Sequence, residues 1–214
     1  MTYTRLIGLG ANKVIRLIVR GLALSKIHPN VLTFIGLVIN IIAAVFLAMG
    51  EFFWGGIVII SAGVFDMVDG RVARETNQVT RFGGYFDSVL DRYSDLALLM
   101  GLLVYYGNIS RPFYVVLTAI VMTGSVMVSY TRARAENTIP SCKVGFMERP
   151  ERVVLLIIGA LFNRMAPVLW VIAVLANVTV IHRMAFTYQE AKRLEDAQLR
   201  AVRSEPPAAG SHVN

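Results

Sequence analysis

Acidic residues recur at helical spacing in two neighbouring segments of this sequence. Asp66 and Asp69 stand three residues apart, and Asp87 and Asp91 stand four residues apart. Each spacing brings the two carboxylates of a pair to one face of an α-helix. Four carboxylates carry a charge of about minus four, which two divalent cations would neutralise, and oxygen ligands favour Mg²⁺, with Mn²⁺ as a substitute. We therefore expect these four aspartates to bind two metal ions, an arrangement that suits phosphoryl transfer.

Residues beside the first aspartate pair extend the same helical face. Gly70, Ala73 and Arg74 follow Asp66 at positions i+4, i+7 and i+8. The two small residues leave room for a bulky group near the backbone, and the guanidinium group can bind a phosphate one turn further on. This face is therefore suited to a ligand that carries phosphate.

The composition indicates that these segments lie in a membrane. Of the 214 residues, 56% are hydrophobic, whereas a soluble domain has roughly 45–50%. The single cysteine, Cys142, excludes an intramolecular disulfide. There are 21 Lys and Arg against 14 Asp and Glu. In a membrane protein, this balance favours anionic lipid head groups and phosphate-bearing substrates, and we do not expect nucleic acid as a partner.

Apolar runs long enough to cross a bilayer predict an all-α integral membrane protein with one domain, residues 1–203. The six predicted transmembrane helices cover residues 31–49, 53–74, 82–106, 113–135, 148–162 and 165–187. Residues 1–24 have apolar positions at helical spacing, which predicts an amphipathic helix at the membrane interface. Residues 204–214 are a short Pro/Ala/Gly tail that we expect to be disordered.

The distribution of Lys and Arg predicts the orientation of these helices. If the N-terminus is cytoplasmic, 19 of the 21 Lys and Arg lie at cytoplasmic ends, and only Arg111 and Arg164 lie at the outer ends. Lys and Arg are retained on the cytoplasmic side of a membrane. We therefore expect a multi-pass plasma-membrane protein with both termini and all four aspartates on the cytoplasmic side.

The segment from Asp66 to Asp91 also resembles the motif of a known enzyme family. It reads D-x-x-D-G-x-x-A-R, eight residues, G, three residues, D, three residues, D, without a departure. The pattern is similar to that of the CDP-alcohol phosphatidyltransferases. These integral membrane enzymes transfer a phosphatidyl group from CDP-diacylglycerol, or a related CDP-linked donor, to an alcohol and release CMP. The resemblance extends over nearly the whole chain and implies a homodimer.

The resemblance implies roles for individual residues. The four aspartates would bind the metals, and Asp91 would also act as general base on the acceptor hydroxyl. A carboxylate is a weak base at neutral pH, so this role requires that the metal acidify the hydroxyl or that Asp91 be partly released from the metal. The residues implied in binding CDP-diacylglycerol are Pro29, Asn30, Val31, Leu32, Asp69, Gly70, Ala73, Arg74 and Thr80.

Arginines near the predicted cytoplasmic ends of the last three helices indicate an anionic acceptor. A guanidinium group binds phosphate through two hydrogen bonds, which favours a phosphorylated alcohol over serine, choline or ethanolamine. The string S-Y-T-R-A-R-A-E, residues 129–136, followed by G-x-x-E-R-x-E-R, residues 145–152, resembles the phosphatidylinositol phosphate synthases of this family. The resemblance implies that the acceptor phosphate binds Ser129, Arg132, Arg134, Arg152 and Arg183. Bacterial synthases of this kind usually have lysine at the position of Arg132, so this sequence departs from their pattern there. The alternative acceptor within the family is glycerol phosphate, which would give phosphatidylglycerol phosphate.

Three other interpretations fit parts of the pattern. A divalent-cation transporter would place its carboxylates near the membrane midplane, whereas these lie at helix ends beside arginines that would repel a cation. A scaffold without catalytic activity would not require the complete motif. The aspartates could also form structural ion pairs with Arg71, Arg74, Arg81 and Arg92. Metal binding is favoured because intramembrane ionisable residues generally have a function.

Overall fold

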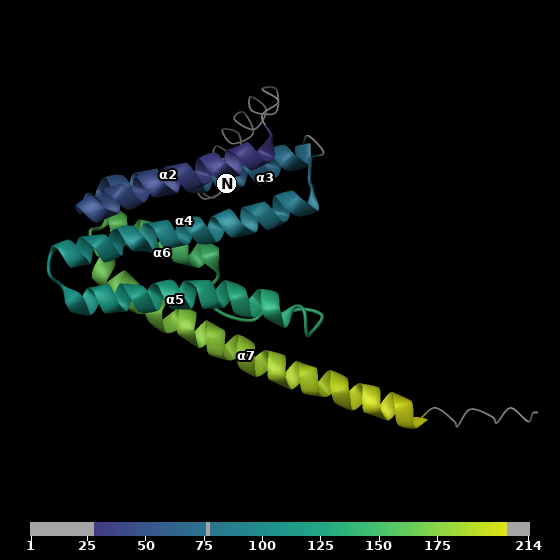
Figure 1. Ribbon diagram of the computed structural model, residues 1–214. Helices are drawn as coiled ribbons and strands as arrows, with labels where there is room; N and C mark the ends of the chain where they lie inside the picture. Colours follow the sequence, from purple (N-terminus) through teal and green to yellow (C-terminus); the bar gives the residue numbers. More distant parts are fainter. Residues whose placement is uncertain (1–27, 76–77, 205–214) are drawn as a thin grey trace, which may run out of the picture.

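The computed structural model describes residues 28–75 and 78–204, apart from the side chains of Asp69, Glu75 and residues 201–204. The described residues form helices and connecting segments, without a β-strand. The helices are α2 (Pro29–Met49), α3 (Phe52–Glu75), α4 (Arg81–Asn108), α5 (Pro112–Ala135), α6 (Arg149–Leu161) and α7 (Met165–Ser204) (Figure 1). The predicted interfacial helix, residues 1–24, and the predicted tail beyond residue 204 lie outside the described residues.

Local sequence signals determine where two of these helices begin. Pro29 opens α2, where its fixed φ suits the first turn, and Nδ1 of His28 accepts a hydrogen bond from the Asn30 amide at 3.2 Å. The Oγ1 atom of Thr80 caps α4 by accepting from the Gly83 amide at 2.9 Å. These capped ends carry several of the residues that the sequence predicts to bind ligands.

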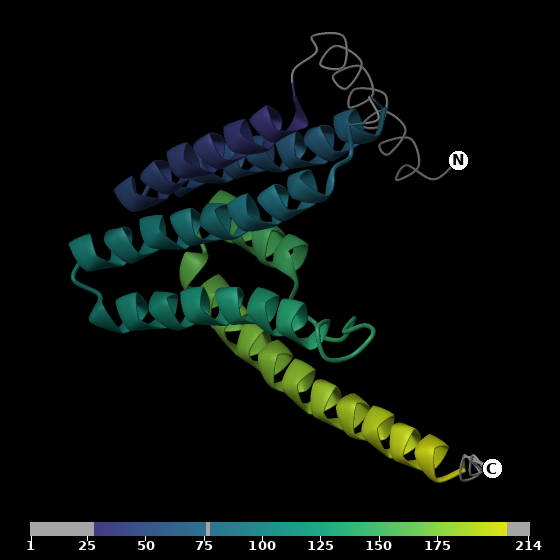
Figure 2. The same cartoon turned by 45° about the vertical axis from the view of Figure 1, so that its right-hand side comes forward.

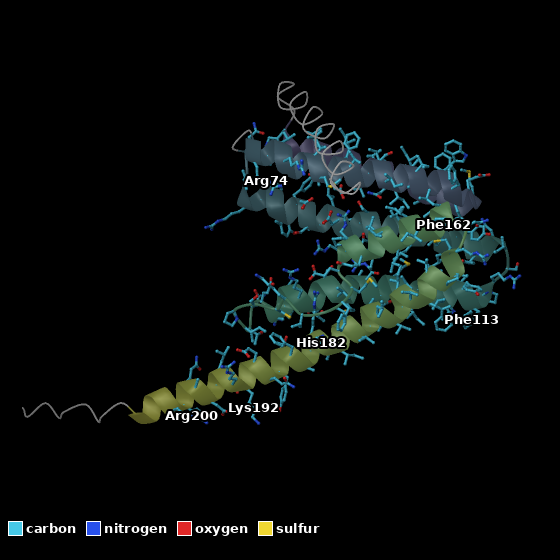
Figure 3. All side chains as sticks on the ribbon, turned by 180° about the vertical axis from the view of Figure 1, so that it is seen from behind. Arg74, Phe113, Phe162, His182, Lys192 and Arg200 are labelled. Atoms are coloured by element: carbon cyan, nitrogen blue, oxygen red, sulfur yellow. The ribbon has the colours of Figure 1, made fainter. Side chains whose placement is uncertain are left out.

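Successive helices run in opposite directions, so one end of the bundle gathers the functional candidates. The starts of α2, α4 and α6 and the ends of α3 and α5 lie at this end (Figure 1). Helix α7 runs past it as a long extension (Figure 2). Arg74 lies at this end, whereas Phe113 and Phe162 lie at the opposite end (Figure 3). The predicted aspartates and most of the predicted arginines therefore share one end of the molecule.

Helix packing brings distant parts of the chain to this end. Helix α2 packs against α3 and α4, α5 packs against α4 and α7, and α6 contacts both α3 and α7. The α2 and α4 backbones meet at Gly101, where an added Cβ would lie 2.3 Å from the carbonyl oxygen of Ala44. A side chain at this position would push the two helices apart, so the close crossing requires glycine.

Four of the helices are long and apolar enough to cross a membrane: Pro29–Met49, Phe52–Arg74, Pro112–Ala135 and Met165–Arg200. Large apolar side chains such as Phe34, Ile41 and Val45 point outward from α2, as expected for contact with lipid. Helix α4 is charged in its first half, and the 13 residues of α6 span only about 20 Å. The membrane character is thus confirmed, whereas the crossing of all six helices stays a prediction.

Candidate active site

Two of the predicted metal ligands contact an arginine, Arg149, that is not among the predicted site residues. Nη2 of Arg149 lies 2.8 Å from Oδ2 of Asp66, and its Nη1 lies 2.9 Å from Oδ1 of Asp91. Asp66 comes from α3, Asp91 from α4 and Arg149 from the first turn of α6. The structure therefore brings the two carboxylates together, as the motif predicts, but with a guanidinium group between them.

A buried ion pair lies beside this contact. Nη2 of Arg152 lies 2.6 Å from Oδ2 of Asp95, and these residues are 3% and 7% exposed. Nε of Arg149 lies 3.4 Å from the other oxygen, Oδ1, of Asp95. Breaking a buried pair costs about 3–5 kcal/mol because one charge is left uncompensated. The pair therefore fixes the start of α6 against α4.

Helix α2 leaves space for one of the predicted ligands through a glycine. A Cβ atom at Gly36 would lie 2.8 Å from Oδ1 of Asp66. The Asp66 carboxylate is therefore packed against the α2 backbone. Nothing in the sequence around Gly36 indicates this role, because the two residues belong to different helices.

The remaining ligand candidates lie near this point along the same helices. Asp87 precedes Asp91 by one turn on α4 and is half-buried. The side chain of Asp69 lies outside the described residues. As placed, no group of three or more Asp, Glu, His or Cys side chains in the described part of the chain could hold a metal. The convergence of Asp66 and Asp91, with only oxygen donors from the four aspartates, nevertheless fits Mg²⁺ or Mn²⁺.

A cavity of about 320 Å³ has Asp87 in its lining. We call it the α2–α3–α4 cavity. Its lining residues are Pro29, Asn30, Thr33, Gly70, Ala73, Arg74, Gln78, Val79, Thr80, Gly83, Gly84 and Asp87. Six residues predicted to bind the nucleotide donor are in this lining. Of the other predicted donor residues, Val31 points outward and Leu32 is buried in the core, so neither lines the cavity.

Two predicted residues form part of the cavity wall through local hydrogen bonds. Nε of Arg74 donates to the carbonyl oxygen of Gly70 at 2.9 Å, so the arginine folds back over its own helix. Thr80 is held by its capping bond to Gly83, and a Cβ at Gly83 would lie 3.3 Å from Oδ1 of Asn30. The starts of α2 and α4 therefore face each other across the cavity.

A second, mostly apolar cavity of about 410 Å³ lies between α3 and α6. We call it the α3–α6 cavity. Its lining includes the apolar residues Ile59, Ile60, Val64, Met67, Val153, Val154 and Ile157. Asp66, Asp95 and Arg149 also line it, so this apolar space adjoins the aspartates. No short motif marks it, because its walls come from helices far apart in the sequence.

Three of the five predicted acceptor residues gather around the start of α6. Nη1 of Arg132 lies 3.1 Å from Oε1 of Glu148, and Nη2 of Arg183 lies 2.9 Å from the same oxygen. Arg152 follows Glu148 by four residues and so lies on the same side of α6. Its Nη1 atom is buried without a hydrogen-bond partner, a feature that suits an anionic ligand.

The other two predicted acceptor residues lie elsewhere. Arg134 lines a cavity of about 380 Å³ between α5 and α7, to which Arg183 also contributes. Ser129 lines a different cavity of about 480 Å³ between α4 and α5. Arg132 and Arg134 are only two residues apart on α5, which turns their side chains to different sides of that helix. The structure thus separates residues that the sequence motif groups together.

Comparisons with known proteins agree with the motif. A family model described as CDP-alcohol phosphatidyltransferase matches residues 26–189. The archaetidylinositol phosphate synthase of Pyrococcus horikoshii is 37% identical over 175 residues, which cover 81% of this chain and 89% of that protein. The phosphatidylinositol phosphate synthase of Mycobacteroides abscessus is 36% identical over 168 residues, or 73% of this chain and 75% of that one.

Solved structures show the same architecture. The crystal structure of Mycobacterium tuberculosis phosphatidylinositol phosphate synthase with CDP-DAG bound matches with a TM-score of 0.77 and 32% identity. It covers 82% of this chain and 94% of that chain. A structure of the same enzyme in complex with manganese and citrate matches with a TM-score of 0.75 and 33% identity, over 81% of this chain and 88% of that chain.

Proposed function

Because this chain belongs to the CDP-alcohol phosphatidyltransferase family, we propose that it transfers a phosphatidyl group from CDP-diacylglycerol to inositol phosphate. The products are phosphatidylinositol phosphate and CMP. The observation that carries the proposal is the α2–α3–α4 cavity, where Asn30, Gly70, Ala73 and Arg74 share the lining with Asp87. Relatives named for inositol phosphate lipids, at 36–37% identity, support the acceptor.

The cytidine diphosphate part of the donor occupies the α2–α3–α4 cavity in this proposal. Gly70 and Ala73 present little side chain, so the donor can approach the α3 backbone, and Arg74 stands at the cavity wall to bind phosphate. The diacylglycerol part enters the α3–α6 cavity, whose apolar lining suits acyl chains. Asp66 and Arg149 line that cavity, so the reacting phosphate would lie near the aspartates.

The aspartates carry the chemistry. Asp66, Asp69, Asp87 and Asp91 would hold two divalent ions, Mg²⁺ or Mn²⁺, which supply charge neutralisation and polarise the phosphoryl oxygens when bound. Asp91 takes the proton from the acceptor hydroxyl. The hydroxyl oxygen forms a bond to the phosphorus that bears diacylglycerol, and the bond from this phosphorus to the oxygen of CMP breaks.

The acceptor phosphate binds at the start of α6. Arg132, Arg152 and Arg183 supply positive charge there, and the buried Nη1 of Arg152 has no hydrogen-bond partner. Glu148 would have to share Arg132 and Arg183 with the incoming phosphate.

We extend the proposal to a homodimer in the plasma membrane with this end of the bundle in the cytoplasm, where the soluble acceptor is available. The apolar outer faces of the helices and the distribution of Lys and Arg support this placement.

The direct test offers purified protein several acceptors separately. With CDP-diacylglycerol and Mg²⁺, we expect lipid product and CMP with inositol phosphate, and little with free inositol, glycerol phosphate or serine. Product only with free inositol or serine would contradict the role of the arginines. A parallel set with CDP-archaeol tests the donor lipid, because one relative is an archaetidylinositol phosphate synthase.

Asp91→Asn is the matched variant for this assay. It preserves the size of the side chain but removes the base, so we expect turnover to fall by about 10²–10⁴-fold or more while the protein stays folded and dimeric. Substantial turnover by this variant would exclude Asp91 as the base. Metal flux into proteoliposomes without CMP release would instead indicate a cation transporter.

A further inference from the structure

We propose that Arg149 competes with the divalent metal for Asp66 and Asp91, so that this arginine acts as an internal counterion of the active site. The inference rests on the proposed function, since it takes these aspartates to be metal ligands. It starts from the contacts of one guanidinium group with three carboxylates. Nη2 contacts Asp66 at 2.8 Å, Nη1 contacts Asp91 at 2.9 Å and Nε lies 3.4 Å from Asp95.

The contacts at Asp66 and Asp91 exclude a metal ion bound between the same oxygens. A Mg²⁺ ion lies about 2.0–2.1 Å from its carboxylate oxygens. With Arg149 in its observed position, such an ion would lie within a few Å of the guanidinium group. At that separation two positive charges repel strongly in a partly buried site. Oδ2 of Asp66 and Oδ1 of Asp91 therefore serve either Arg149 or the metal.

The Arg149 side chain can leave Asp66 and Asp91 without disturbing the fold. Arg149 is the first residue of α6, and its side chain reaches the aspartates through a flexible stem. The position of α6 is fixed independently by the buried pair between Arg152 and Asp95. A rotation of the Arg149 side chain toward Asp95 or solvent would release Asp66 and Asp91 while α6 stays in place.

The competition has two measurable consequences. Arg149 neutralises carboxylates that would otherwise repel each other, so the protein without metal needs it for stability. A metal ion that binds Asp66 and Asp91 must displace it, so Arg149 weakens metal binding. Removing the guanidinium group should therefore make metal binding tighter and make the fold depend on metal.

The test is a titration of purified protein in detergent with Mn²⁺ alone, followed by calorimetry, for wild type, Arg149→Gln and Arg92→Gln. Arg92 is the matched control, because its Nη1 is 3.9 Å from Oδ2 of Asp91 and bonds its own helix at the carbonyl of Ser88. We expect Arg149→Gln to bind Mn²⁺ at least tenfold more tightly than wild type. The affinity of Arg92→Gln for Mn²⁺ should stay within about twofold of wild type, because the contact of Arg92 with Asp91 is long and screened by solvent.

Thermal melting in EDTA and in Mn²⁺ supplies the second measurement. Arg149→Gln should melt well below wild type in EDTA and recover in Mn²⁺. If it does not fold without metal, Arg149→Lys carries the test, because lysine keeps the charge but cannot bridge both carboxylates. Arg149→Lys should bind Mn²⁺ at least threefold more tightly than wild type.

The outcomes separate this inference from the proposed function. Equal or weaker Mn²⁺ binding by the Arg149 variants, with an active wild-type enzyme that binds Mn²⁺, would overturn the competition and leave the proposed function intact. Failure of the wild-type protein to bind Mn²⁺ at all would overturn the metal assignment itself, and the inference with it.

Discussion

Two single residues outside the motif affect its aspartates, one through the space that it leaves and the other through its charge. Gly36 leaves space, since an added Cβ would approach Oδ1 of Asp66 to 2.8 Å. Arg149 supplies charge to Asp66 and Asp91. Neither residue belongs to the Asp66–Asp91 motif, yet both contact a residue of it. The geometry of the motif therefore depends on residues outside it.

Gly36→Ala tests the contribution of space. The new Cβ would force the Asp66 carboxylate to shift, and small displacements of a catalytic group are costly, up to about 10²-fold in rate. We expect turnover to fall at least tenfold, which kinetic assays of the purified enzyme would measure. The melting temperature should not fall, because alanine is favoured over glycine in a helix by about 1 kcal/mol.

Gly107→Ala is the control for this substitution, since a Cβ there meets nothing within 4 Å. It lies near the end of α4, at the opposite end of the bundle. Wild-type turnover by Gly36→Ala would mean that Asp66 does not depend on its contact with α2.

The sequence predicts this site only where its residues are close in the chain. Asp87 and Asp91 belong to one helical turn, so their spacing alone places them on one face. The contact between Asp66 and Arg149 joins residues 83 positions apart, and no local pattern encodes it. The sequence alone suggests Arg71, Arg74, Arg81 and Arg92 as ion-pair partners of the four aspartates. The structure instead pairs both Asp66 and Asp91 with Arg149 of α6, and Arg92 only approaches Asp91 at 3.9 Å.

At the scale of elements, the connection between α5 and α6 is held by α7. Oγ1 of Thr179 accepts hydrogen bonds from the amides of Phe146 and Met147 at 3.2 and 3.1 Å. Nε of Arg183 donates to the carbonyl oxygen of Val144 at 2.8 Å. This connection leads directly into Glu148 and Arg149. Helix α7 therefore positions the start of α6 without contributing to the Asp66–Asp91 motif.

Thr179→Val tests this positioning. Valine has nearly the same shape but leaves two amides without their acceptor, and an unsatisfied buried group costs about 1–3 kcal/mol. We expect the free energy of unfolding to fall by about 2 kcal/mol, measured by denaturant titration in detergent. Turnover should also fall, because Arg152, which is proposed to bind the acceptor phosphate, follows the connection. Thr123→Val is the control, since the exposed Thr123 hydroxyl bonds only the carbonyl of Ala119 on its own helix. Equal stability of the two variants would contradict the role of Thr179.

Helix boundaries follow closely from the sequence, whereas the connection does not. The predicted range 31–49 corresponds to Pro29–Met49, and 148–162 corresponds to Arg149–Leu161. These boundaries depend on apolar runs and on proline and glycine, which are local signals. The path of residues 136–148 depends on Thr179 and Arg183, which lie more than thirty residues further along the chain. The path of this connection can therefore be predicted only from the tertiary structure.

At the scale of the whole molecule, alternating helix directions collect charge at one end. The aspartates and the arginines of α5 and α6 share this end (Figure 1). Arg111 and Arg164 lie in two of the connections at the other end, α4–α5 and α6–α7. This segregation matches the predicted distribution of Lys and Arg across a membrane. It also places arginines of α6 next to the carboxylates. The proposed orientation and the proposed chemistry therefore depend on the same property of the bundle.

The orientation and the number of crossings can be tested together by cysteine labelling. Cys142, the only cysteine, is buried, so Cys142→Ala provides a background without an accessible thiol. Arg111→Cys, Asn137→Cys and Arg164→Cys then place one thiol in each of three successive connections. With a membrane-impermeant maleimide on intact cells, we expect positions 111 and 164 to react and position 137 to react only after permeabilisation.

The short helix α6 makes position 164 the decisive one. Its 13 residues reach only about 20 Å of the roughly 30 Å hydrocarbon core, so α6 crosses only if its charged first turn lies within the membrane boundary. The ion pairs of Arg149 and Arg152 with Asp66, Asp91 and Asp95 compensate those charges and make such a position possible. Labelling of positions 137 and 164 from the same side would show that α6 does not cross, and would reduce the predicted six spans.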